Sequence, residues 1–194
     1  MRDSDRNVKH ALLIDLDGVL YQAGVLIDGA IETLQWIREQ QIPHLFVTNT
    51  TSRSRALLVD KFEALGFSAG VEEIMTPVVA AAQWLRDHRL KRAALFVPES
   101  TQQDFGDIEA VARDRGEAVE AVIVGDLGAA WTFDILNQAF RLLMQEPRPQ
   151  LIALGMTRYW RTANGLQLDV APFVKALEHA ASCEAVVVLS LIHI

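Results

Sequence analysis

Short apolar runs alternate with amphipathic segments along this chain, and this alternation constrains its fold more than any other feature. Strands are expected at residues 11–16 and 42–50, and helices at residues 29–40 and 52–67, where apolar side chains recur three and four residues apart. Gly66 stands where the second helix is expected to end. Strands joined through helices by short connections are typical of a parallel sheet that helices cover. The sequence therefore predicts an α/β protein.

The alternation continues beyond Thr76 and Pro77, the expected hinge between two α/β units. Further strands are expected at residues 93–99, 120–126, 150–155 and 184–188. Further helices are expected at residues 78–88, 132–145 and 171–181, and a loop at residues 156–170. Phe133, Leu136, Phe140 and Leu143 are expected to form the core face of the helix at residues 132–145. The expected domains are thus residues 1–77 and residues 78–188, with residues 189–194 as a short tail.

The composition narrows the range of functions. The chain has 194 residues, of which 51% are hydrophobic, enough for the core of one large or two small domains. Its formal net charge of -7 argues against binding to nucleic acids or anionic membranes, which need clustered lysine and arginine. No apolar run approaches the roughly 20 residues of a membrane span, and residues 1–10 do not resemble a secretory signal. A cytoplasmic protein with no nucleic-acid or membrane partner is therefore expected.

Two carboxylates lie at the end of the first expected strand. Asp15 and Asp17 belong to the run ALLIDLD, and Gly18 follows and lets the backbone turn sharply. Open α/β sheets bind their ligands at the carboxyl ends of their strands. Two acids at that place are suited to hold Mg²⁺, which prefers oxygen ligands and is often bound by one or two carboxylates together with a substrate phosphate. The alternative is that the pair caps a turn or faces solvent.

The second expected strand ends in a run of hydroxyl and amide side chains. Thr48, Asn49, Thr50, Thr51 and Ser52 lead into the second expected helix. Hydroxyls and backbone N–H groups at the start of a helix suit an anion such as phosphate. The alternative is that the run only caps the helix. The acids after the first strand could hold a metal cation, and the donors after the second strand could hold a phosphate. Both features, in this order after two consecutive strands, favour phosphoryl chemistry.

These motifs resemble a known family. DLDGVLY together with VTNTTSRSR is similar to the first two motifs of the haloacid dehalogenase (HAD) superfamily of phosphatases, and most similar to subclass IIA, which carries a large α/β cap after the second motif. The segments LNQAFRLLM, LIALGMTRYWRTANGLQLDVAPFVKALEHA and EAVVV resemble the same subclass. The resemblance implies the N-terminal part of a Rossmann-like core with an inserted α/β cap of the C2 type.

The resemblance also implies roles for individual residues. Asp15 would be the nucleophile that forms an aspartyl-phosphate, and Asp17 would be the general acid and base. The second carboxylate oxygen of Asp15 and the backbone carbonyl of Asp17 would ligate Mg²⁺. Asp15, Leu16, Asp17, Thr48 and Asn49 would contact the phosphoryl group. The substrate would be a small phosphorylated compound, and a homodimer is left open.

The expected loop would lie over this site and set specificity. Arg158, Tyr159, Trp160 and Arg161 would then contact the part of the substrate beyond the phosphate. A packed turn with solvated arginines is an equal alternative.

The family pattern also has a lysine in a Gly-Lys-Pro context and further acids after the strand that resembles EAVVV, and neither is found in this sequence. Residues 189–194, LSLIHI, are what CTG TCT CTT ATA CAC ATC encodes, and those nucleotides resemble a common transposase-based sequencing adapter. We therefore expect a non-native tail on a truncated and inactive fragment. A native apolar tail is the alternative.

Two other functions are weighed against the phosphatase. One is a non-catalytic phosphate-binding or interaction module. The other is a phosphoacceptor receiver domain, which also gathers acids at strand ends. The run VTNTTS and the long second α/β unit argue against the receiver domain.

Overall fold

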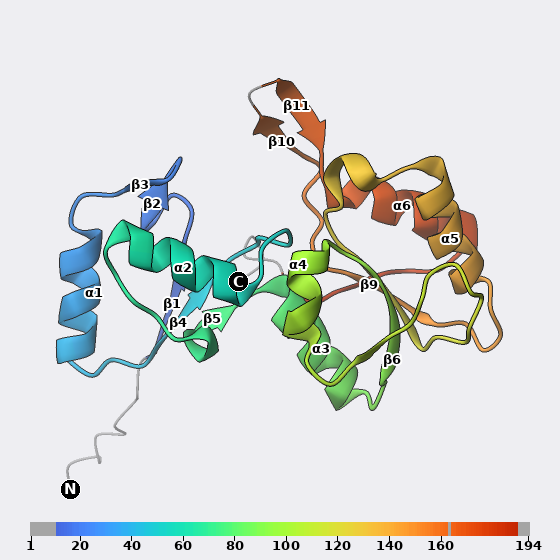
Figure 1. The fold of residues 1–194 in the computed structure, drawn as a ribbon, viewed down its shortest axis with the longest axis horizontal. Helices are drawn as coiled ribbons and strands as arrows, with labels where there is room; N and C mark the ends of the chain where they lie inside the picture. The colour runs from blue at the N-terminus through green and yellow to red at the C-terminus, as the bar shows by residue number, and fades with distance from the viewer. Residues whose placement is uncertain (1–10, 163, 190–194) are drawn as a thin grey trace, which may run out of the picture. The chain divides into compact units, whose positions relative to one another are not determined.

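The computed structural model describes residues 11–162 and 164–189. Residues 1–10, 163 and 190–194 lie outside the described residues, and the last of these ranges holds most of the expected tail. The chain divides into two compact units (Figure 1). The first comprises Met1–Thr48 and Val59–Met75, and the second Asn49–Leu58 and Thr76–Ile194.

The first unit is built on a small parallel sheet. Its strands are β1 (Leu12–Asp15), β4 (His44–Val47) and β5 (Ile74–Met75), in the order β1-β4-β5. A two-stranded antiparallel ribbon, β2 (Tyr21–Gln22) and β3 (Val25–Leu26), follows β1 along the chain. The helices are α1 (Ala30–Glu39), α2 (Arg55–Leu65) and the 3₁₀ turn η1 (Val71–Glu73), and the first four residues of α2 are grouped with the second unit.

Helical spacing of apolar residues accounts for both α-helices. Ala30, Leu34 and Ile37 are the buried face of α1, as the sequence predicted. In α2, Phe62 is fully buried and stacks on Phe67 at a centroid distance of 4.6 Å. Gly66 ends α2 with a φ of 93°, a backbone conformation that L side chains rarely adopt, so glycine is needed there.

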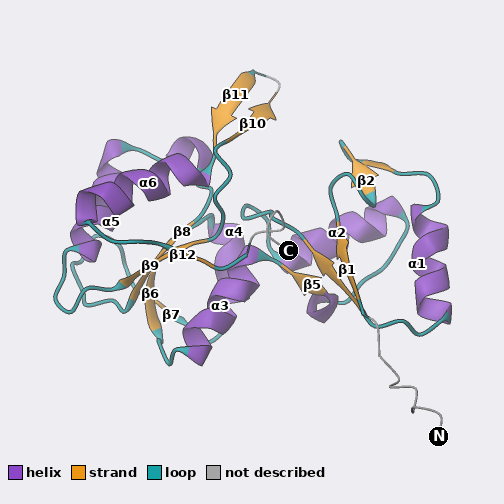
Figure 2. Cartoon of the chain, turned by 180° about the vertical axis from the view of Figure 1, so that it is seen from behind, coloured by secondary structure: helices purple, strands orange, loops and turns teal. Residues whose placement is uncertain are grey.

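The second unit holds a larger parallel sheet (Figure 2). Its strand order is β12-β9-β8-β6-β7. The strands are β6 (Arg92–Phe96), β7 (Glu109–Ala110), β8 (Ala121–Val124), β9 (Gln150–Ala153) and β12 (Val186–Val187). The helices are α3 (Pro77–Asp87), α4 (Glu99–Gln102), α5 (Phe133–Leu143) and α6 (Val170–Ala181), with 3₁₀ turns η2 (Gln103–Phe105) and η3 (Gly128–Ala130).

Both faces of this sheet are covered. Val122 packs in one cluster with residues of α5 and α6, and Ile123 packs in another with residues of α3. Neighbouring residues of one strand point to opposite faces, so an unbroken apolar run is suited to a sheet with helices on both sides. The predicted α/β fold with parallel sheets is confirmed.

The structure corrects two sequence predictions. The expected loop at residues 156–170 contains an antiparallel hairpin, β10 (Tyr159–Thr162) and β11 (Gly165–Leu168). Asn164 and Gly165 form an Asn-Gly pair, which is a frequent sequence signal of a tight hairpin. The other error concerns Phe133, expected in the helix core, which is 79% exposed because it is the first residue of α5.

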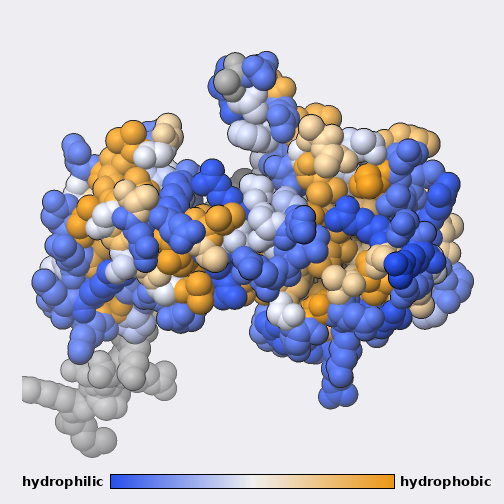
Figure 3. All heavy atoms as spheres, viewed as in Figure 1, coloured by the Kyte–Doolittle hydropathy of each residue, from blue (hydrophilic) through white to orange (hydrophobic). Residues whose placement is uncertain are grey.

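Apolar side chains also reach the surface of both units (Figure 3). In the described residues, no helix combines the length and the apolar character that crossing a bilayer requires.

Candidate functional site

Two of the predicted site residues meet at the carboxyl edge of the first unit's sheet. Strands β1 and β4 are parallel, and Asp15 is paired with Val47, the residue before Thr48. The backbone N of Thr48 donates to the carbonyl oxygen of Met75 at 3.1 Å, which fixes it beside β5. Asp15 and Thr48 therefore lie next to each other at the end of adjacent strands, where parallel sheets place ligands.

The turn after β1 fixes the Asp15 carboxylate. The backbone N of Leu16 donates to Asp15 Oδ1 at 2.8 Å, and the Leu16 side chain is fully buried. The Leu16 carbonyl oxygen accepts a hydrogen bond from Leu20 N at 3.0 Å, while Gly18 N donates to the Tyr21 carbonyl oxygen at 2.8 Å. Gly18 has a φ of 83°, which this tight turn requires. The strand can thus end in an acid because the main chain beside it supplies a donor.

Asp17 lies on the same turn in a different setting. Its side chain is exposed, and its backbone bridges to Tyr21. Asp15 is half-buried, so one carboxylate accepts a hydrogen bond from the main chain and the other is open to solvent. This difference suits one acid that acts as a nucleophile and a second that transfers protons.

The residues after β4 differ in exposure. Thr48 is 2% exposed, whereas Asn49 is exposed and is grouped with the second unit. Thr51 is buried, and its Oγ1 accepts a hydrogen bond from Asp126 N at 3.3 Å. The structure therefore sets Thr48 beside Asp15, and it leaves Asn49 one residue further along with an accessible amide.

Ser54, rather than the run Thr48–Ser52, caps helix α2. Its hydroxyl oxygen accepts a hydrogen bond from Leu57 N at 3.4 Å, and its carbonyl oxygen accepts one from Leu58 N at 3.1 Å. The helix thus begins three residues later than expected. The alternative that the run only caps the helix is therefore wrong.

The acids at this edge of the sheet carry oxygen atoms that could bind a metal ion. Asp15 and Asp17 offer carboxylate oxygens, the ligand type that Mg²⁺ prefers, and Mg²⁺ commonly uses one or two carboxylates together with water and phosphate. Within residues 11–162 and 164–189, no group of three or more His, Cys, Asp or Glu side chains is placed to hold a metal ion. The two acids therefore fit Mg²⁺ as part of its shell.

A cation beside the β1 turn was not predicted from the sequence. Lys61 of α2 places its Nζ 3.4 Å from the centroid of the Tyr21 ring, and Tyr21 is 1% exposed. A cation over an aromatic face is attractive, and it ties the turn that carries Asp17 to α2. The tyrosine in DLDGVLY was the available signal, but its partner lies 40 residues away and has no local pattern.

The hairpin residues predicted to read the substrate are exposed. Tyr159 and Trp160 are 51% and 46% exposed, and the Arg158 guanidinium carbon lies 5.7 Å from the centroid of the Tyr159 ring. Asp169 follows the hairpin and caps α6 through a hydrogen bond from Val170 N. Burial, and to a lesser extent the charge of Asp126, raises the pKa of Asp169, although the bond from Val170 N opposes the shift. An acidic pair thus lies near the base of an exposed aromatic hairpin.

Comparison with known proteins agrees with this geometry. Residues 12–109 match the haloacid dehalogenase-like hydrolase family. The human phospholysine phosphohistidine inorganic pyrophosphate phosphatase is 34% identical over 91% of this chain, which spans 64% of that protein. The chain belongs to the haloacid dehalogenase-like hydrolase family.

Two further proteins are similar to the chain. The rat haloacid dehalogenase-like hydrolase domain-containing protein 2 is 36% identical over 94% of this chain and 67% of its own length. The structure of the p-nitrophenyl phosphatase from Archaeoglobus fulgidus superposes with a TM-score of 0.80 at 22% identity, over 92% of this chain and 67% of that one, and so supports the fold. The chain therefore spans slightly less than two thirds of the human HAD relative.

Proposed function

We propose that this chain carries the nucleophile-bearing part of a Mg²⁺-dependent HAD phosphatase. The observation that carries the proposal is the Asp15 carboxylate, held by Leu16 N at 2.8 Å beside Thr48 at the carboxyl edge of the sheet. The similarity to phosphatases over more than 90% of the chain supports the same reaction class.

The chemistry needs two carboxylates with different tasks. An oxygen of Asp15 attacks phosphorus, and the bond from phosphorus to the leaving oxygen breaks as Asp17 gives that oxygen a proton. The resulting aspartyl-phosphate is cleaved when Asp17, now ionised, takes a proton from a water molecule that attacks phosphorus. Phosphate leaves, and the Asp15 carboxylate and the protonated Asp17 are restored.

The remaining residues bind and orient. Thr48 and Asn49 would donate hydrogen bonds to the phosphoryl oxygens, and the main chain after Leu16 would border the same group. A carboxylate oxygen of Asp15 and the main-chain carbonyl oxygen of Asp17 would hold Mg²⁺, which supplies a positive charge that offsets the charge on the phosphoryl oxygens. A fixed donor at Leu16 N keeps the nucleophile in one orientation before the substrate arrives.

The substrate proposed here is a small phosphorylated compound, such as a phosphoric ester, a phosphoramide or pyrophosphate. The human relative is named for pyrophosphate and two phosphorylated amino acids, and the archaeal one for p-nitrophenyl phosphate, all of them small. We further propose that residues 1–77 are the N-terminal part of a HAD core and that residues 78–188 are a C2-type cap, which sets specificity through Arg158–Arg161. A homodimer, a cytoplasmic location, and the absence of a nucleic-acid or membrane partner are also proposed. The prediction that the chain as printed is inactive stays a prediction.

One experiment tests the reaction in two arms. The 194-residue chain is assayed with p-nitrophenyl phosphate and Mg²⁺, and we expect little or no turnover. In the second arm, the portion of the human relative that this chain does not span is fused after Val188. We expect this chimera to turn over, and Asp15→Asn to lower its kcat at least about 10³-fold.

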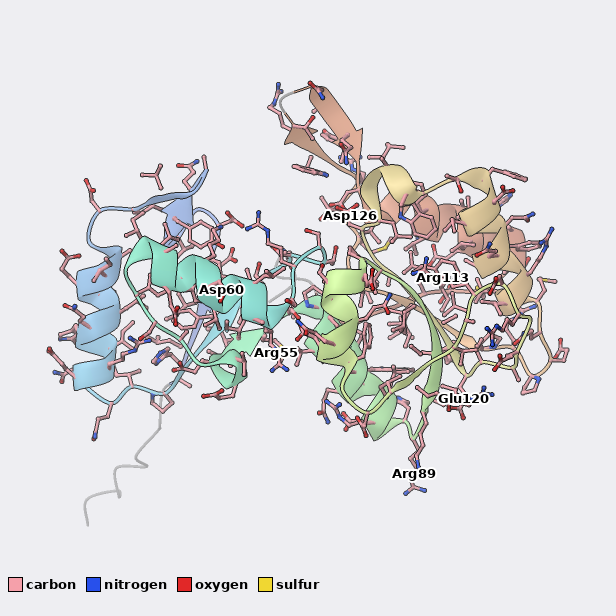
Figure 4. All side chains as sticks on the ribbon, in the orientation of Figure 1. Arg55, Asp60, Arg89, Arg113, Glu120 and Asp126 are labelled. Carbon is pink, nitrogen blue, oxygen red and sulfur yellow. The ribbon has the colours of Figure 1, made fainter. Side chains whose placement is uncertain are left out.

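The matched control is Asp60→Asn, an exposed acid on α2 that is labelled in Figure 4, which should leave kcat unchanged. A folded chimera in which Asp15→Asn keeps full activity would contradict the assignment of the nucleophile. Binding of inorganic phosphate by the chimera without any turnover would favour the non-catalytic phosphate-binding module instead.

A further inference from the structure

A cavity of about 480 Å³ opens beside the edge of β6 in the second unit. The residues of its wall that matter here are Leu95, Gln102, Val111, Arg113, Asp114 and Gln138. They come from β6, from α4, from α5 and from the segment after β7. The volume falls in the range of small-molecule sites, about 300–1,000 Å³.

The cavity lies where the β6–β7 ladder stops. The two strands pair only at Arg92↔Glu109 and Ala93↔Ala110, and the last bond runs from Val111 N to the Ala93 carbonyl oxygen at 2.9 Å. Alternate residues of a parallel strand point their N–H and C=O groups to the same neighbour, so the backbone of Leu95 faces the side that β7 has left. In the described part of the chain no backbone bond joins Leu95 to the segment after β7, and Leu95 is one of the residues that line the cavity.

Arg113 brings a positive charge to the cavity. Its guanidinium carbon lies 5.0 Å from the centroid of the Phe96 ring, and its Nη2 donates to the Val97 carbonyl oxygen at 3.4 Å (the residue is labelled in Figure 4). None of the ion pairs formed by residues 11–162 and 164–189 includes Arg113. Burial lowers the pKa of its guanidinium from the ordinary value. A half-buried guanidinium with several unused N–H donors is suited to a planar carboxylate.

The next residue adds the opposite charge. Asp114 also lines the cavity and is exposed, and the amides of Gln102 and Gln138 border it from α4 and α5. Asp114 would repel a simple anion and Arg113 would repel a simple cation, whereas a molecule that carries both charges is attracted to both. The amides and the strand edge add hydrogen-bonding groups, and Leu95 and Val111 add an apolar wall.

We propose that this cavity binds a small zwitterion of the α-amino-acid class, with its carboxylate on Arg113 and its ammonium group on Asp114. Near neutral pH both groups of such a ligand are charged. The site belongs to the second unit alone and does not depend on the chemistry proposed for Asp15.

The test uses the 194-residue chain and the twenty common L-α-amino acids, added one at a time. Binding is measured by isothermal titration calorimetry and by the shift in melting temperature. At least one amino acid is expected to bind with a Kd below about 10 mM. The amide of that amino acid, which lacks the carboxylate, and its N-acetyl form, which lacks the ammonium group, should each bind at least about tenfold more weakly.

Variants locate the site. Arg113→Met and Asp114→Asn should each weaken binding at least about tenfold, while Arg89→Met, at an exposed arginine of the same unit outside the cavity, should leave it unchanged. Because Arg113 contacts Phe96 and could be needed for folding, the exposed Asp114 supplies the second, independent variant. Failure of every amino acid to bind overturns the proposal. It is also overturned if inorganic phosphate or acetate binds as tightly as the best amino acid, or if Asp114→Asn has no effect.

Discussion

The two parallel sheets of this molecule expose their apolar strands differently. Ala121–Val124 of β8 is fully buried, with a strand on each side and helices on both faces. In β1, Leu12 and Leu13 are 37% and 60% exposed, and β1 is the last strand of its sheet in the described residues. Both segments are apolar runs with β-forming character, so composition alone does not decide burial. The neighbours that a strand finds in space decide it.

The stability of the first unit is expected to depend on the side of its sheet that α2 covers. Phe62 is fully buried against Phe46 and Phe67, so Phe62→Ala should destabilise this unit by about 4 kcal/mol through lost burial and a cavity. Hydrogen exchange followed peptide by peptide should show loss of protection in residues 44–47 and 58–65. Protection of residues 121–124 should remain. Equal loss of protection in both regions would show that the two units unfold as one.

Leu151 tests the covered sheet, and the exposed Leu13 of β1 is its counterpart. Leu151 of β9 is 2% exposed and lies in the cluster with α5 and α6, so Leu151→Ala should cost about 3 kcal/mol. Urea unfolding measures the change in the free energy of unfolding, and hydrogen exchange of residues 150–153 shows whether β9 loses protection. A cost of less than about 1 kcal/mol would mean that the cluster collapses around the missing side chain, contrary to a close-packed core.

Sequence reasoning was most successful where the pattern is local. The apolar spacing of α1, the cap at Gly66 and the alternation of strands and helices need only neighbouring residues, and the structure agrees with them. Exposure of Leu13 was not predicted, because it depends on which strand lies beyond β1. The hairpin at Tyr159–Thr162 and Gly165–Leu168 was missed although its turn signal was present.

The candidate site divides in the same way. The position of Asp15 and Thr48 at one sheet edge follows from strand order, which the alternation of elements predicts. The bond from Leu16 N to Asp15 joins adjacent residues but depends on the side-chain conformation of Asp15. The contact of Lys61 with Tyr21 joins residues 40 positions apart, which no short sequence pattern encodes.

A third prediction concerns the start of the covered sheet. Glu120 Oε2 accepts hydrogen bonds from Lys91 N at 2.7 Å and from Arg92 N at 2.9 Å, and these bonds lower the pKa of Glu120 although its slight burial opposes them. A lowered pKa in the folded state means that the ionised form stabilises the fold at neutral pH. This contribution is lost as the pH falls from the unfolded value, about 4.3, through the folded one.

Glu120→Gln should therefore destabilise the chain at pH 7 by less than about 1 kcal/mol, because the group is exposed to solvent. The difference from the parent chain should disappear near pH 3. Urea unfolding at several pH values measures it, with Glu184→Gln, another exposed acid of the second unit, as the control. A difference that persists unchanged at low pH would show that the two backbone bonds do not depend on the charge.

The smallest effect is expected at the exposed strand and completes the comparison of leucines. Leu13 is 60% exposed, so Leu13→Ala removes little buried area and should change the free energy of unfolding by less than about 0.5 kcal/mol. The same substitution at Leu151 should cost several times more, although both residues lie in parallel strands. Urea unfolding at several protein concentrations makes the measurement decisive. A cost near that of Leu151→Ala that grows with protein concentration would mean that another copy of the chain covers β1, because an edge strand with exposed leucines readily pairs with a second chain. A small cost at every concentration would mean that β1 keeps its open edge in solution.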